Sequence, residues 1–68
     1  MMVSRVEAIQ IARAECVLRG WPWLAPIEVH WGLFTLTVIT NVKSRGCNVR
    51  IRVRRRDGAV VSADLAPS

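Results

Sequence analysis

Apolar and charged residues alternate strictly between Val49 and Arg54. Valine or isoleucine occupies positions 49, 51 and 53, and arginine occupies positions 50, 52 and 54. A period of two is typical of a β-strand with one buried and one exposed face. The pattern therefore predicts a strand over residues 47–55, whose apolar face covers a core and whose other face presents guanidinium groups to water.

The beginning of the chain follows a helical pattern instead. Ser4 and Glu7 have the spacing of a capping box, in which the serine hydroxyl and the glutamate carboxylate each accept from the other residue's backbone N–H. Gly20 stands where a left-handed residue would end the helix. We predict a helix over residues 5–19. The residues expected on its buried side are Ala8, Ile9, Ala12 and Cys16.

The segment after this helix contains two prolines and two tryptophans. Pro22 and Pro26 exclude a helix and favour an extended connection. Two interpretations of Trp21 and Trp23 remain open. Their indoles either plug the end of the core, where each buries a large apolar area, or form an aromatic platform for a peptide or a base.

Three further strands are predicted around the arginine-bearing one. Residues 27–31 alternate, residues 33–41 are rich in β-branched and aromatic side chains, and residues 59–65 return after a turn at 56–58. Residues 41–46 are expected to form a loop. The register that keeps one face apolar places Val53 opposite Val61, Ile51 opposite Ala63 and Val49 opposite Leu65.

These elements predict a single α+β domain over residues 1–68, with one N-terminal helix packed on a three- to four-stranded antiparallel β-meander. A chain of this length buries only about 60% of its unfolded surface. At least one of Trp21 and Trp23 should belong to the core. The other expected core residues are Ala8, Ile9, Ala12, Cys16, Phe34, Leu36, Val38, Val49, Ile51 and Val53.

The charge is distributed unevenly. The net charge is +5, and the acidic and basic residues of positions 1–40 cancel, so that the whole excess lies from Asn41 onward. A basic half attracts anionic partners of several kinds. The candidate binding surface comprises Arg50, Arg52, Arg54, Arg55, Arg56, Lys43, Arg45, Trp21 and Trp23. Three interpretations remain open for the arginine face: a plain solvated surface, a site for nucleic acid and a site for an acidic protein.

Catalytic and metal motifs are not found in the sequence. His30 is the sole histidine, and Cys16 and Cys47 do not form a compact ligand pair, so we expect no metal, no cofactor and no enzymatic activity. Nothing in the sequence suggests export, so we expect both thiols to be reduced. No apolar run reaches the roughly 18 residues of a membrane span. We expect a soluble, cytoplasmic protein.

Two segments resemble PepSY-type domains. The capped helix start Ser4-x-x-Glu7-Ala8-Ile9-x-Ile11-Ala12 is similar to the opening helix of that family, and residues 53–61 are similar to its closing hairpin. The usual T-G-E of that hairpin is replaced by Asp57-Gly58-Ala59. The resemblance implies a helix on an antiparallel sheet and a non-enzymatic role in binding or inhibiting peptidases.

The favoured function is therefore a small non-catalytic binding module for a protein partner, as in peptidase inhibitors, and the alternative is nucleic-acid binding by residues 50–56. Surplus apolar surface also predicts a homodimer. Ile11 and Leu18, which lie beside the buried stripe of the helix, are one route to such a dimer, and an unpaired sheet edge is the other.

Overall fold

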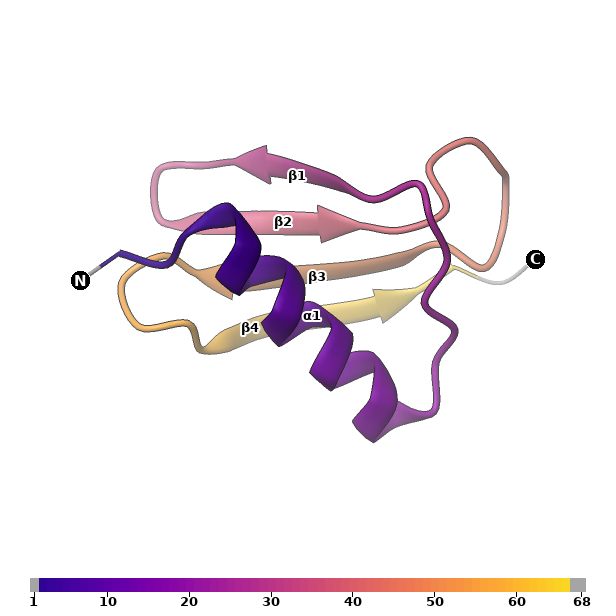
Figure 1. Cartoon of the computed structure of the whole chain (residues 1–68), viewed down its shortest axis with the longest axis horizontal. Coiled ribbons are helices and arrows are strands. Elements are labelled where there is room, and N and C mark those ends of the chain that lie inside the picture. The colour runs from indigo at the N-terminus through magenta and orange to yellow at the C-terminus, as the bar shows by residue number, and fades with distance from the viewer. Residues whose placement is uncertain (1, 67–68) are drawn as a thin grey trace.

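A computed structural model describes residues 2–66 of the chain. One helix lies on one face of a four-stranded antiparallel sheet with the order β1-β2-β3-β4, as Figure 1 shows. The elements are α1 (Arg5–Arg19), β1 (Glu28–Trp31), β2 (Thr35–Ile39), β3 (Val49–Arg54) and β4 (Val60–Leu65). The predicted α+β meander is confirmed, with four strands.

The helix has the predicted bounds because both of its ends are determined locally. The Ser4 backbone N–H donates to Glu7 Oε1 at 3.0 Å, and the Glu7 N–H donates to Ser4 Oγ at 3.1 Å. At the other end Gly20 is left-handed, with φ 69°, and its N–H donates to the Val17 carbonyl. These bonds satisfy backbone groups that the end of a helix would otherwise leave unpaired.

The core lies between α1 and the two central strands, β2 and β3. Ala8, Ala12 and Cys16 are fully buried, which lets the helix backbone approach the sheet closely. The fully buried strand residues beneath them are Leu36, Val38, Val49, Ile51 and Val53. Trp21 and Trp23 are half-buried and pack against this cluster.

Two residues expected in the core lie elsewhere. Ile9 is only half-buried, and Phe34 is 77% exposed. Phe34 is exposed because β2 begins two residues later than predicted, after a tight turn in which the Gly32 N–H donates to the Thr35 carbonyl at 2.8 Å. Leu33 and Phe34 are thus the two central residues of a hairpin turn, outside the alternation of the strand.

The pairing of β3 with β4 confirms the predicted register at one end and corrects it at the other. Val49 pairs with Leu65 and Ile51 with Ala63, but Val53 pairs with Val60 and not with Val61. The Arg54 N–H donates to the Ala59 carbonyl at 2.8 Å, so the turn comprises residues 55–58 and is one residue longer than predicted. An irregularity in β4 compensates for this shift, and Val61 is left 51% exposed.

The connection from β2 to β3 is held by side chains that no sequence motif marks. Asn48 Nδ2 donates to the carbonyls of Thr40 at 3.0 Å and Asn41 at 2.8 Å. Thr40 is fully buried, and its Oγ1 accepts the Val49 N–H at 2.9 Å. Asn41 and Cys47 have positive φ, so the backbone turns there and both strands are shorter than predicted.

Candidate functional site

The sheet face opposite the helix carries part of the predicted arginine surface. Arg50 and Arg52 are exposed there, because burial alternates along β3. Arg52 pairs across the sheet with Thr37 and Ser62, and Arg50 pairs with Ile39 and Asp64. Thr35, which pairs with Arg54, is a second threonine beside the arginines, so the face is polar around their guanidinium groups.

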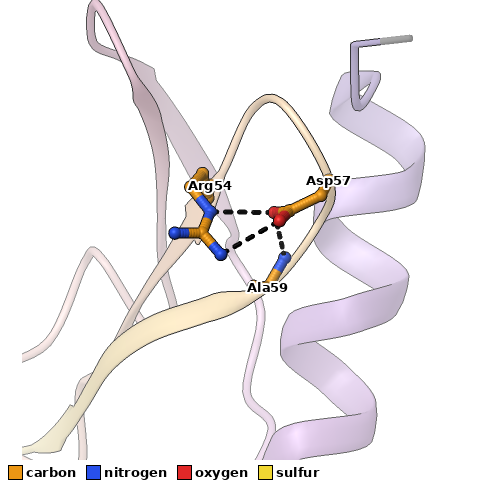
Figure 2. A network of polar contacts seen from close by, with 3 residues as sticks. All are labelled: Arg54, Asp57 and Ala59. Atoms are coloured by element: carbon orange, nitrogen blue, oxygen red, sulfur yellow. Dashed lines mark hydrogen bonds and ion pairs between the residues drawn. The ribbon is translucent and has the colours of Figure 1, made fainter.

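Arg54, on the same strand, is engaged within its own hairpin. Figure 2 shows its guanidinium paired with the Asp57 carboxylate: Nε donates to Oδ1 and Nη2 donates to Oδ2, each at 2.9 Å. Asp57 Oδ1 also accepts the Ala59 N–H at 3.0 Å. The hydrogen bonds from Arg54, together with the one from Ala59, lower the pKa of Asp57 to about 2.

Arg55 holds the turn between β1 and β2. Its backbone N–H donates to the Phe34 carbonyl at 2.8 Å, and its Nη1 donates to the Gly32 carbonyl at 3.0 Å. The guanidinium carbon also lies 5.3 Å from the centroid of the Trp31 ring, within the range of a cation–π interaction. Arg55 thus joins the two hairpins at this end of the sheet.

The turn that Arg55 holds is strongly apolar and exposed. Leu33 is 84% exposed, Phe34 77%, Trp31 57% and Met2 56%. The N-terminal segment reaches the same end of the sheet as both hairpin turns (Figure 1), since the Val3 N–H donates to the Arg55 carbonyl at 2.7 Å. We call Met2, Trp31, Leu33 and Phe34 the hairpin patch.

An open hollow of about 480 Å³ adjoins this patch. One side of its lining is apolar and the other is formed by three successive arginines. The lining residues are Met2, Leu33, Phe34, Arg54, Arg55 and Arg56. An apolar surface beside cationic groups is the kind of lining that binds an amphipathic anion.

The other predicted site residues do not join this group. Lys43 and Arg45 are exposed in the connection between β2 and β3, at the opposite end of the sheet from Arg56 (Figure 1). Trp21 lies under the Arg19 guanidinium, 5.0 Å from ring centroid to guanidinium carbon. Neither Trp21 nor Trp23 belongs to the hairpin patch. The predicted basic surface is thus divided among the two ends and the open face.

The groups with catalytic potential are scattered. His30 Nε2 lies 3.0 Å from Glu28 Oε1, and both side chains are more than half exposed. Cys16 is buried, which together with Glu15 raises the pKa of its thiol, and Cys47 is a second free thiol. Within residues 2–66, no group of three or more His, Cys, Asp or Glu side chains could hold a metal ion. No helix of this part of the chain is long and apolar enough to span a membrane.

The exposed residues of the helix differ from those predicted to form a dimer surface. Ile11 packs partly buried against the core, and a Cβ built on Gly58 would lie 3.1 Å from its Cδ1. Ile11 therefore does not form an exposed patch with Leu18, and that part of the prediction is wrong. Leu18 is 82% exposed and Val17 is 74% exposed. The homodimer itself stays a prediction.

No family model, no curated protein and no solved structure matches this chain. The resemblance of the capped helix and the closing hairpin to PepSY-type domains stays a prediction.

The hairpin patch does not follow from the sequence pattern, because that pattern predicts Leu33 and Phe34 inside a strand. A usable signal was present in Gly32, which marks a turn and is followed three residues later by β-branched Thr35. A tight turn over residues 32–35 leaves the bulky side chains of Leu33 and Phe34 without a place in the core. No signal in the sequence indicates the role of Arg55, because that role depends on contacts with residues more than twenty positions away.

Proposed function

We propose that this chain is a non-catalytic protein-binding module that contacts its partner through the hairpin patch. The observation that carries the proposal is the exposure of Leu33 and Phe34, at 84% and 77%, side by side on one turn. Clustered apolar side chains on a surface are a mark of protein interaction sites, and aromatic residues are enriched there. A peptidase-inhibitor role, implied by the resemblance, would be one form of this function.

The rigidity of the turn also supports the proposal. Arg55 donates to the carbonyls of Gly32 and Phe34, and the turn is closed by the bond from the Gly32 N–H to Thr35. A turn held in this way loses little conformational entropy when it meets a partner, so more of the contact energy is available for affinity. An exposed phenylalanine on a rigid turn is therefore well suited to anchor a complex.

The test is affinity capture from the source cell with chemical crosslinking. Leu33→Ser combined with Phe34→Ser should remove the captured partner, while Arg50→Ser combined with Arg52→Ser should retain it. Circular dichroism controls for folding, since all four side chains are exposed. If the partner is still captured by the Leu33→Ser and Phe34→Ser variant but not by the Arg50→Ser and Arg52→Ser variant, the proposal is contradicted. The binding surface would then be the open face.

The second candidate is nucleic-acid binding by the open face, favoured by the exposure of Arg50 and Arg52 on adjacent outward positions. Glu28 and Asp64 belong to the same face, where they would repel phosphates. Single-strand binders also stack bases on aromatic rings, and among the described strand residues the ring on this face is that of His30. A labelled oligonucleotide should bind with a steep loss of affinity as salt rises if this candidate holds.

A further inference from the structure

The hollow beside the hairpin patch has two chemically distinct sides. Met2, Leu33 and Phe34 supply the apolar side, and three consecutive arginines supply the cationic side. Its volume of about 480 Å³ lies within the range of sites that accept a bulky side chain or a small ligand. A purely apolar occupant would leave the arginines without an anionic partner, and a purely anionic one would leave the apolar side chains uncovered.

The charge around the hollow is only partly balanced. Arg54 is neutralised by Asp57. Arg55 donates to the uncharged carbonyls of Gly32 and Leu33, and its buried Nε has no acceptor among residues 2–66. Arg56 is exposed, and no ion pair of the described chain includes it. The positive charges of Arg55 and Arg56 therefore remain available to an anionic partner.

From these two features we infer that the hollow binds an acidic peptide segment of the partner, which inserts one large apolar side chain beside an aspartate or a glutamate. The inference rests on the proposed function and names the chemistry of its partner. The inserted side chain contacts Leu33 and Phe34, while the carboxylate lies beside Arg56 and the uncompensated charge of Arg55. Charge complementarity of this kind raises the association rate and selects among partners.

A peptide fits this end of the molecule better than an anionic bilayer does. Glu7 and Asp57 line a second hollow beside Arg56, together with Met2 and Val3. A broad anionic surface would bring its charge against these carboxylates as well as against the arginines. A peptide carries its carboxylates at chosen positions, so it can place them at Arg56 and avoid Glu7.

The test begins with selection of a random library of short linear peptides against the intact chain. The selected peptides should carry an acidic residue next to a large apolar one. Leu33→Ser combined with Phe34→Ser should weaken their binding roughly 30-fold, as expected for anchor residues. Arg56→Glu should weaken it about fivefold or more, and so should replacement of the peptide's carboxylates by amides. The matched control is Arg52→Glu on the open face, which should leave the affinity within about twofold.

The outcomes separate this inference from the proposed function. Selected peptides without acidic residues, bound through Leu33 and Phe34 and insensitive to Arg56→Glu, would overturn the inference and leave the proposed function standing. Acidic peptides that lose binding with Arg52→Glu but not with the hairpin variant would overturn both. A selection without binders would also count against both. Vesicles of phosphatidylglycerol are the last probe, and tighter binding to them than to any peptide would overturn the inference in favour of a bilayer.

Discussion

The guanidinium of Arg54 and the carboxylate of Asp57 face one another as a doubly hydrogen-bonded pair within a single hairpin. Asp57 also accepts the Ala59 N–H, so one carboxylate joins the end of β3, the turn and the start of β4 (Figure 2). The pair closes the turn at residues 55–58, whose extra residue shifts the register at the start of β4. It also removes Arg54 from the charge that is available for binding.

The stability of the chain should therefore fall in acid. The pKa of Asp57 is lowered from 3.8 to about 2 by folding, so between these values the unfolded state binds more protons than the folded one. The stabilisation is present above pH 3.8 and is lost as the pH falls through about 2. Thermal denaturation between pH 7 and pH 2 measures it.

The variant Asp57→Asn should be less stable than the wild type at pH 7 and should lose less stability on acidification. The control is Asp64→Asn, because within residues 2–66 the Asp64 side chain takes part in no ion pair. This control should retain the acid-induced loss of the wild type. If the stability of the wild type and of Asp57→Asn depends on pH in the same way, Asp57 is not the source of the acid-induced loss.

Replacing Arg55 should loosen the hairpin patch. Arg55→Ala removes the hydrogen bonds to the Gly32 and Leu33 carbonyls and the contact with the Trp31 ring, at a cost of about 1–2 kcal/mol in the free energy of unfolding. Hydrogen exchange of the Gly32 amide, which donates to Thr35, should become faster. The adjacent variant Arg56→Ala should change neither the free energy of unfolding nor the exchange rate of the Gly32 amide. Equal effects of the two variants would show that the Arg55 side chain does not hold this turn.

Two apolar residues two positions apart should differ sharply in their contribution to stability. Leu36 is fully buried and Phe34 is 77% exposed. Leu36→Ala should cost roughly 2–5 kcal/mol, because it removes buried methyl groups and leaves a cavity. Phe34→Ala should stay within about 0.5 kcal/mol of the wild type. Urea denaturation gives both values, and a large cost for Phe34→Ala would mean that this ring is part of the core.

Two glycines with positive φ should respond differently to alanine. At Gly20 an added Cβ has no neighbour within 4 Å, so Gly20→Ala should cost only the left-handed backbone, about 1–2 kcal/mol. At Gly58 the Cβ would lie 3.1 Å from Ile11 Cδ1 and 3.4 Å from Val3 Cγ2, and φ is 78°. Gly58→Ala should therefore lower the Tm further than Gly20→Ala. The reverse order would show that Ile11 does not pack under this turn.

The buried hydroxyl of Thr40 provides a last test. Thr40→Val removes the acceptor of the Val49 N–H without changing the size of the side chain much, and a buried donor left unpaired costs about 1–3 kcal/mol. The matched control is Thr37→Val on the open face, which should be close to neutral. Equal stability of the two variants in urea denaturation would contradict the role of Thr40.

Local patterns in the sequence were sufficient for the helix and for the two faces of β3. The capping box and Gly20 act on backbone groups within four residues, so α1 has the predicted bounds. The alternation of valine and isoleucine with arginine specified which face of β3 is buried, because successive side chains of a strand point to opposite faces of the sheet. The order of the strands followed as well, since short connections favour neighbouring antiparallel strands.

The tertiary structure decided the features that depend on contacts between distant segments. The longer turn between Arg54 and Ala59 shifted Val60 into the place expected for Val61. The packing of Ile11 beside Gly58 removed Ile11 from the exposed helix surface. Arg55 holds the turn at Gly32 because the end of β3 meets that turn in the folded sheet. A residue's neighbours in sequence determine its backbone preference, but the role of its side chain depends on which surfaces the folded sheet brings against it.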